Sequence, residues 1–379
     1  MQYTLHLTNE CNCKCTYCGL HQNKETMSSE NAFKAIDLAL SDKQKATGIG
    51  FYGGEPLLCK NLIYDIVNYA TSKIAGLDKK MFFKLTTNGL MLDDEFLEFA
   101  KINGILISLS LDGNKAAHDL NRKTHSGVGT YEKVATIIPK LLAHNRYTST
   151  LMTITPNNVE FFHDLVKHIY SLGFVSIICS LDYSANWNDK SLYELKKQYQ
   201  KLAELYYERT KAEDKFFLSP FESKINSHIQ HKDYCSERCK LGYEQISVSP
   251  DGSLYPCVQF VGDSKYQIGH VTNGINQSKR KEIFKESQLE YSECQDCAIK
   301  SRCLHTCACI NKYSTGSLNE PSPVLCYSER TLISIADRVA ARLYKQRNGI
   351  FIHKHYNEFY SLVSLVEDSE ITKNGAETQ

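Results

Sequence analysis

The chain of 379 residues is long enough for one large domain with a smaller module, and its hydrophobic content of 42% allows it to bury a core. Its 44 basic and 43 acidic residues give a formal net charge of +1, so bulk charge gives no support to binding of nucleic acid or of a membrane surface. No apolar run approaches the roughly 20 residues of a membrane span, and the N-terminus lacks the basic and apolar regions of a signal peptide. We therefore expect a cytoplasmic protein that uses its Cys, 15 in number, as metal ligands more than in disulfides, because thiols stay reduced in that compartment.

In chain order, the first half alternates strand-like with helix-like segments. Apolar runs predict strands at residues 3–7, 49–52, 81–85, 105–111, 151–155 and 176–180. Apolar residues at helical spacing predict helices at 29–40, around 62–70, at 131–142 and at 159–172. Alternating β and α units indicate a parallel sheet with helices outside it, and in barrels of this kind the functional residues gather at the C-terminal ends of the strands.

The first predicted strand leads into the sequence C-N-C-K-C-T-Y-C, in which Cys11, Cys15 and Cys18 have the spacing C-x3-C-x2-C. Thiolates select iron-sulfur clusters, zinc or Cu(I), and three of them leave one iron of a four-iron cluster open to a substrate or cofactor. Cys13 falls outside the spacing, and we expect it not to be a ligand. The spacing arises by chance in roughly 2 of 100 chains with this Cys content, so a second feature is needed.

Polar motifs follow two further strands. The second strand runs into Gly53-Gly54-Glu55-Pro56, where two glycines allow a close backbone approach, although alone this would be a strand ending in a turn. The fourth strand ends at Ser110-Leu-Asp-Gly and is followed by Arg122. An Arg in this place is more often a surface or ion-pair residue than a ligand contact.

Further along, a helix is expected at 191–211, and the composition changes after Pro220. Nine Cys then appear, and eight of them carry the pattern, namely Cys235, Cys239, Cys257, Cys294, Cys297, Cys303, Cys307 and Cys326. Four of them form the run C-x2-C-x5-C-x3-C, which has a random likelihood on the order of 1 in 1000. Eight Cys could also fill two closed tetrahedral zinc sites. We assign no role to the remaining thiols of Cys59, Cys179 and Cys309, since a free Cys usually behaves as a small buried hydrophobe.

The C-terminal part is expected to be helical. A helix is predicted at 328–347 with Gly349 just past its end, and a shorter helical stretch at 359–366. The tail from residue 367 is polar, and we expect it to be disordered.

Together, the Cys triad, the Gly-Gly-Glu-Pro turn and the second group of Cys resemble radical SAM enzymes with a C-terminal SPASM domain, in particular maturases of ribosomally made peptides. The resemblance implies an α/β fold with a partial, open (β/α)6 TIM-like barrel at residues 1–225. It also implies a small Cys-rich SPASM domain at 226–330, which holds two auxiliary clusters. A C-terminal helical extension with a disordered tail would then occupy 331–379.

The resemblance also implies the site, with three [4Fe-4S] clusters and S-adenosyl-L-methionine as cofactors. Cys11, Cys15 and Cys18 would bind the first cluster, whose open iron chelates the cofactor. The implied cofactor contacts are Tyr17, Gly53, Gly54, Glu55, Ser110 and Arg122. The implied ligands are Cys235, Cys239, Cys257 and Cys307 for the inner auxiliary cluster, and Cys294, Cys297, Cys303 and Cys326 for the outer one.

The implied reaction is reductive cleavage of S-adenosylmethionine to a 5′-deoxyadenosyl radical, with electrons from a donor such as flavodoxin or ferredoxin. Enzymes of this architecture mostly modify precursor peptides or sulfatases. Sulfatase maturases carry an Asp that acts as a general base where this chain has Val258, directly after Cys257. We therefore favour a peptide maturase that forms a Cys thioether crosslink, with a carbon-carbon crosslink second. The pattern also leaves open a formylglycine-forming sulfatase maturase and a non-catalytic iron-sulfur or zinc protein.

Overall fold

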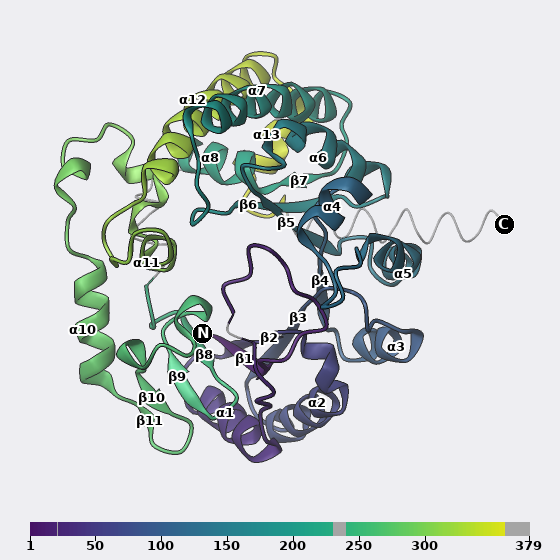
Figure 1. Cartoon of the computed structure of the whole chain (residues 1–379), viewed down its shortest axis with the longest axis vertical. Coiled ribbons are helices and arrows are strands. Elements are labelled where there is room, and N and C mark those ends of the chain that lie inside the picture. The colour runs from purple at the N-terminus through teal and green to yellow at the C-terminus, as the bar shows by residue number, and fades with distance from the viewer. Residues whose placement is uncertain (21, 230–239, 361–379) are drawn as a thin grey trace.

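The centre of the molecule is one sheet that curves around the site without closing (Figure 1). The computed structural model describes residues 1–20, 22–229 and 240–360. The strands lie in the order β11-β10-β9-β8-β1-β2-β3-β4-β5-β6-β7, and the neighbours from β8 to β7 in this order are parallel. The remaining neighbours, β8 to β11, are antiparallel. The described sheet thus combines an open parallel barrel with an antiparallel extension.

The strands of the parallel part include all six that the sequence predicts. Their bounds are β1 Gln2–Thr8, β2 Ala46–Gly53, β3 Lys80–Thr87, β4 Leu106–Ser110, β5 Ser149–Ile154, β6 Ser176–Leu181 and β7 Phe217–Leu218. The antiparallel part comprises β8 Gln245–Val248, β9 Ser253–Tyr255, β10 Gly269–His270 and β11 Gly274–Ile275. The predicted α/β fold with an open barrel is confirmed.

Helices cover the outer face of the sheet (Figure 1). Those of the barrel are α1 Ser29–Ser41, α2 Lys60–Ile74, α3 Asp94–Ile102, α4 Lys115–Asn121, α5 Tyr131–His144, α6 Phe162–Ser171, α7 Asp189–Lys211 and α8 Ser219–Ile229. The later ones are α10 Gln277–Ser287, α11 Ala308–Thr315, α12 Pro323–Lys345 and α13 Gly349–Tyr356. The sequence of α1 explains why it forms a helix here. The Ser28 side chain caps it by accepting from the Asn31 amide, and Ala32, Ile36 and other residues at helical spacing are buried.

The C-terminal helices differ from the prediction. α12 begins at Pro323, five residues earlier than expected, because Ser322 caps it and Pro is favoured at the first helical position. The left-handed residue after its end is Arg347, which has a φ of 55°, whereas Gly349 starts α13. Phe359 lies in a turn and is 68% exposed, so it packs no helix face. The rest of the expected 359–366 stretch from residue 361 on, and the tail, lie outside the described residues.

The predicted barrel and SPASM domains share one continuous sheet. The predicted division after residue 225 falls inside α8, and β8 pairs with β1 of the barrel. α12 packs along α7 and α8, with a buried ion pair between Lys224 and Glu329 at 2.6 Å and a hydrogen bond between the Tyr199 and Ser328 hydroxyls at 2.9 Å. The domain limits stay a prediction.

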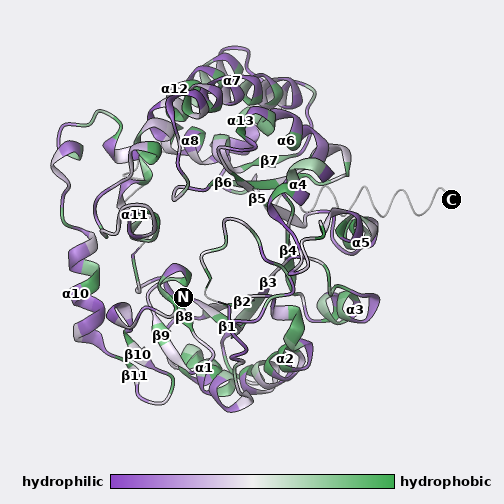
Figure 2. Ribbon diagram, in the orientation of Figure 1, coloured by the Kyte–Doolittle hydropathy of each residue, from purple (hydrophilic) through white to green (hydrophobic). Residues whose placement is uncertain are grey.

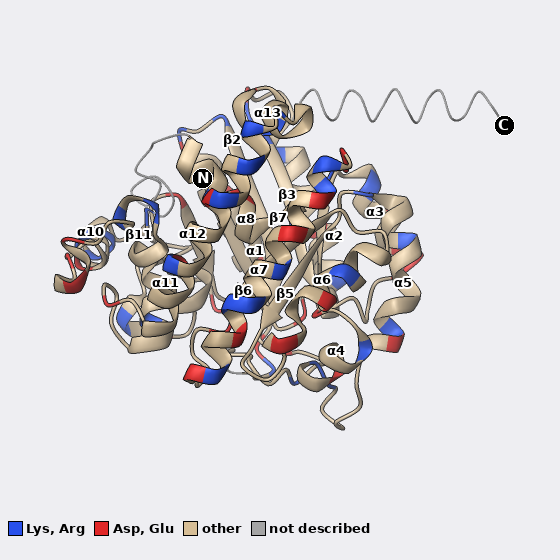
Figure 3. Cartoon of the chain, turned by 90° about the horizontal axis from the view of Figure 1, so that it is seen from above, with Lys and Arg blue, Asp and Glu red and all other residues tan. Residues whose placement is uncertain are grey.

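The outer surface is polar and mixed in charge. α10, of which Ile283 and Ser287 are buried, is coloured mostly as hydrophilic in Figure 2. Lys, Arg, Asp and Glu are interspersed over the view of Figure 3. Within the described ranges, no helix combines the length and the hydrophobicity that crossing a membrane requires.

Candidate active site

A cavity of about 780 Å³ lies at the C-terminal ends of the barrel strands. Its wall brings together residues from the loop after β1, the ends of the strands and the Cys-rich segment at 258–313. These include Cys11, Cys13, Cys15, Tyr17, Cys18, Gly53, Gly54, Glu55, Ser110, Arg122, Val258 and Cys309. All three Cys of the N-terminal triad and every predicted cofactor contact therefore face one space.

The loop that carries the triad is held by the segment after α4. The Lys14 amide donates to the Lys123 carbonyl at 2.7 Å, and the Thr16 amide donates to the Asn121 carbonyl at 3.0 Å. The Thr16 hydroxyl also donates to the Asn121 side chain at 2.8 Å. This pairing fixes the backbone on either side of Cys15. The sequence alone could not show it, since the partners are more than 100 residues apart.

Cys13 lies in the same wall although it is out of register with the triad. Its side chain is buried, and its hydrogen bond to Cys11 lowers the pKa of the Cys11 thiol. The Asn88 amide group donates to the Asn12 side chain at 2.7 Å and to the Cys13 sulfur at 3.4 Å. Cys13 thus makes contacts within the protein, and the prediction that it is not a ligand stays a prediction.

Gly53 and Gly54 are required by the close approach of two backbones. Gly53 has a φ of 124°, and a Cβ there would lie 2.3 Å from the Thr8 carbonyl oxygen. A Cβ on Gly54 would lie 2.1 Å from the Glu10 carbonyl oxygen. The amides of Gly54 and Glu55 donate to these same two oxygens at 2.8 and 2.9 Å. The glycines therefore allow this turn to pack against the start of the Cys loop, whereas the sequence suggested an approach to a ligand.

Glu55 connects this turn to the end of β3. One carboxylate oxygen accepts from the Leu57 amide at 3.0 Å and the Thr87 hydroxyl at 2.8 Å, and the other accepts from the Asn88 amide at 2.8 Å. The side chain is buried, and this burial raises the pKa of Glu55 to about 7 against the opposing effect of the hydrogen bonds. Since Asn88 contacts the Cys loop, Glu55 positions that loop through Asn88.

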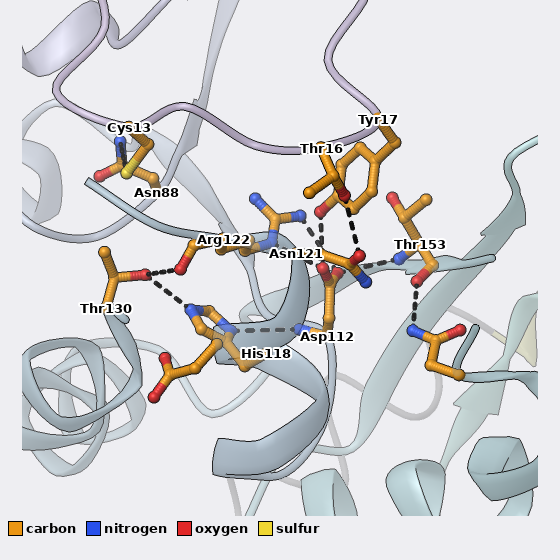
Figure 4. A network of polar contacts seen from close by, with 12 residues as sticks. Cys13, Thr16, Tyr17, Asn88, Asp112, His118, Asn121, Arg122, Thr130 and Thr153 are labelled. Carbon is orange, nitrogen blue, oxygen red and sulfur yellow. Dashed lines mark hydrogen bonds and ion pairs between the residues drawn. The ribbon is translucent and has the colours of Figure 1, made fainter. Parts of the chain in front are cut away.

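Asp112, at the end of β4, is the centre of a buried polar network (Figure 4). It accepts from the Tyr17 hydroxyl at 2.6 Å and from the Thr153 amide at 3.0 Å. Arg122 donates to both carboxylate oxygens, at 3.0 and 3.2 Å. The carboxylate thus joins the Cys loop, β5 and the segment after α4. The sequence pattern contained Asp112 but did not single it out as a site residue.

His118 supports the same network from below the carboxylate (Figure 4). Its Nδ1 accepts from the Asp112 amide at 3.4 Å, and its Nε2 lies 3.0 Å from the Thr130 hydroxyl, which donates to the Arg122 carbonyl at 3.1 Å. This pattern requires the neutral tautomer with hydrogen on Nε2. Burial lowers the pKa of His118 to about 4, in keeping with a neutral ring.

The described thiols of the Cys-rich C-terminal part lie in two groups. Cys257 and Cys307 lie beside Cys309, whose thiol hydrogen-bonds to both and faces the cavity. Sequence reasoning assigned Cys309 no role, because its spacing does not show this contact. In the second group, burial and the charges of Cys297 and Cys326 raise the pKa of the Cys294 thiol.

The other ligand predictions rest partly on residues outside the described ranges. Cys235 and Cys239, predicted for the inner auxiliary cluster, fall there. Among the residues that are described, no three His, Cys, Asp or Glu side chains lie close enough together to hold a single metal ion. The triad does fit a cluster with an open iron, because its three Cys line one cavity. The charges of Cys11 and Cys18 also act on the Cys15 thiol, so the three groups lie near one another.

Comparison with known proteins agrees with this architecture. The model of the radical SAM superfamily matches residues 5–169, and that of an iron-sulfur cluster-binding domain, SPASM, matches residues 239–298. The chain is 26% identical over 320 residues to the cysteine-type anaerobic sulfatase-maturating enzyme of Clostridium perfringens, covering 78% of this chain and 85% of that protein. It is 24% identical over 330 residues to the antilisterial bacteriocin subtilosin biosynthesis protein AlbA of Bacillus subtilis, covering 83% of this chain and 67% of AlbA.

A solved structure, native anSMEcpe with bound AdoMet and Cp18Cys peptide, has the same fold, with a TM-score of 0.77 at 22% identity. The match covers 92% of this chain and all of that one. Residues 5–169 therefore form a radical SAM domain, and radical SAM proteins use a [4Fe-4S] cluster and S-adenosylmethionine. More particularly, the chain is a radical SAM protein with a C-terminal SPASM domain, and enzymes related to it modify peptides or proteins.

Proposed function

We propose that this enzyme closes a Cys thioether crosslink in a ribosomally made precursor peptide. The observation that carries the proposal is Val258, which follows Cys257 and lines the cavity. In sulfatase maturases, as the resemblance implies, that position carries an Asp that acts as a general base. An isopropyl group cannot accept a proton, so the residue that would serve formylglycine formation is replaced by an apolar surface.

Cys11, Cys15 and Cys18 would bind the first cluster with S-adenosylmethionine at its open iron. When bound, the cofactor supplies a 5′-deoxyadenosyl radical that takes hydrogen from a substrate carbon. Arg122 would contact the cofactor through Nη1, the guanidinium nitrogen that makes no hydrogen bond within the described residues, while Nε and Nη2 hold Asp112.

The other predicted cofactor contacts have structural partners as well. Ser110 lines the cavity with Arg122, and we propose that it contacts the carboxylate or ribose. Tyr17 donates a hydrogen bond to Asp112. The carboxylate of Glu55 accepts hydrogen bonds from residues at the end of β3 and from the Leu57 amide of its own turn. Gly53 and Gly54 would contribute backbone carbonyls. We propose that these groups shape the cofactor site mainly by fixing the loops around it.

Two auxiliary clusters would make three [4Fe-4S] clusters in all. We propose the ligands Cys235, Cys239, Cys257 and Cys307 for the inner cluster, and Cys294, Cys297, Cys303 and Cys326 for the outer one. Joining a thiol to a substrate radical releases one electron and one proton, and the electron would leave through these clusters. A flavodoxin or ferredoxin would supply the electron for the first cluster, in a reducing cytoplasmic compartment that keeps the Cys reduced.

A second candidate function is sulfatase maturation. It is favoured by the similarity to the enzyme of Clostridium perfringens, and by two other carboxylates, Asp182 and Asp263, in the cavity wall. Either carboxylate could accept a thiol proton in place of the residue at position 258. The peptide substrate, Cys-containing in both functions, is common to the two candidates.

The experiment is anaerobic incubation of the reconstituted enzyme with candidate precursor peptides and with a Cys-containing sulfatase peptide, followed by mass spectrometry. A thioether lowers the peptide mass by about 2 Da and removes one alkylatable thiol, because one hydrogen atom and one proton leave. A carbon-carbon link gives the same mass change with all thiols retained. Formylglycine formation removes the sulfur, and this outcome would refute the crosslinking proposal.

The electron-exit role has its own control. Cys257→Ala or Cys297→Ala should suppress crosslinking more than formation of 5′-deoxyadenosine, because the electron released in product formation loses its path. Cys11→Ala, Cys15→Ala and Cys18→Ala combined should abolish both. Undiminished crosslinking by both single variants would contradict the electron path.

A further inference from the structure

Arg330 connects two Cys of the second SPASM group. It lies on α12, one turn after Cys326, and its Nε donates to the Cys326 sulfur at 3.4 Å. Its Nη2 donates to the Cys297 sulfur at 3.3 Å. One planar guanidinium therefore contacts a sulfur of α12 and a sulfur of the segment that follows α10.

The charges of three of the four predicted outer ligands act on this guanidinium. Cys297, Cys326 and Cys303 all contribute charges that act on Arg330. The charges of Cys297 and Cys326 in turn act on Cys294. Arg330 thus contacts two of the four predicted ligands and acts electrostatically on a third. A guanidinium remains protonated in proteins, so a positive charge sits at this position at any working pH.

Other cations nearby have carboxylate or hydroxyl partners, although the charge of Lys300 also acts on Cys294. Lys300 forms an ion pair with Glu290, and Arg302 forms a two-pronged ion pair with Asp337 on α12. Arg338, two turns after Arg330 on the same helix, donates to the Ser334 hydroxyl at 2.9 Å. The direct Arg-to-sulfur contact is therefore a specific feature of position 330 and not a general property of a basic helix.

We propose that Arg330 is a positioning residue that raises the reduction potential of the outer auxiliary cluster. This inference rests on the proposed assignment of the four Cys to one cluster. Reduction adds one electron to a four-iron cluster and breaks no bond, so the reduced state is one charge more negative. A fixed cation and two N–H···S hydrogen bonds stabilise that state, and both are known determinants of cluster potential.

A raised potential suits the proposed direction of electron flow. An electron released near the inner cluster moves outward only if the outer cluster accepts it readily. Cys326 and Arg330 are both exposed, so this group of Cys reaches the surface. The outer cluster would then be the point at which electrons leave the chain.

The test is a redox titration, followed by electron paramagnetic resonance, of the full-length reconstituted protein and its Arg330→Gln, Arg330→Lys and Arg338→Gln variants. Arg330→Gln should shift one of the three cluster transitions to lower potential, with the reduced-to-oxidised ratio at fixed potential falling roughly tenfold, equal to about 59 mV for one electron. Arg330→Lys keeps the positive charge but loses the planar pair of N–H donors, so its shift to lower potential should be smaller than that of Arg330→Gln. Arg338→Gln, the matched control, should leave all three transitions unchanged.

Iron analysis separates the possible failures. About twelve iron per chain in every variant, with no shifted transition in Arg330→Gln, would overturn the inference while leaving the cluster assignment intact. Loss of about four iron in Arg330→Gln would also overturn it, because the role would then be to retain the cluster and not to set its potential. About eight iron or fewer in the unmodified chain would refute the three-cluster assignment itself.

Discussion

Replacing Asp112 by Asn should destabilise the barrel strongly. The Asp112 side chain is 0% exposed and that of Arg122 is 10% exposed, so the change leaves a buried guanidinium facing a neutral amide. Asn also has one acceptor oxygen where the carboxylate has two, and its amide hydrogens would point at the Tyr17, Arg122 or Thr153 donors. Breaking a buried ion pair from one side costs about 3–5 kcal/mol, a large part of a typical stability of about 5–15 kcal/mol.

The assay is urea unfolding followed by circular dichroism, with Asp94→Asn as the matched control. Asp94 pairs with Lys140 at 2.7 Å, but the two side chains are 74% and 56% exposed, so losing this pair should cost less than about 1 kcal/mol. Because Tyr17 stands between Cys15 and Cys18, Asp112→Asn should also weaken retention of the first cluster's iron. If both variants unfold within about 1 kcal/mol of the unmodified protein, the network around Asp112 does not stabilise the barrel.

Two further results are expected. Burial raises the pKa of Glu55 from 4.5 to about 7, so the stability that its protonated form contributes is fully present below pH 4.5 and is lost as the pH rises through about 7. Glu55→Gln should flatten the stability profile between these values, and an unchanged slope would contradict the assignment. Iron analysis should show that Cys13→Ala keeps all its iron, whereas replacing Cys11, Cys15 and Cys18 removes about four. Loss of iron from Cys13→Ala would make Cys13 a ligand.

The sequence predicted the strands well because period and composition act locally. β2 and β3 bury apolar residues in short runs bounded by turn residues, and such runs are visible without tertiary information. The triad was also visible, since Cys11 to Cys18 belong to one loop. The start of α12 was missed although Ser322 and Pro323 carry the local signal for it.

The remaining parts of the site depend on contacts between distant segments. Asp112 becomes a central residue only because Tyr17 and Thr153 arrive from other elements. Spacing likewise gives no sign that Cys309 contacts Cys257, or that Arg330 spans two sulfurs. Side chains that act by bringing segments together have no periodic signature, so sequence reasoning predicts ligands from their spacing and misses the residues that position them.

Tyr52, at the end of β2, shows how closely the two parts of the site adjoin. Burial raises the pKa of its hydroxyl, and the charges of Cys18 and Cys257 both add to that rise. Tyr52 therefore stands near the first triad and near the inner SPASM thiols, with the His6 ring packed edge-on against it at 5.2 Å between centroids. Under the proposed cluster assignment, the radical source and the inner auxiliary cluster would both adjoin this cavity, whose wall includes the triad and Cys309. Hydrogen removal and electron release could then occur at one place, without movement of the substrate between two sites.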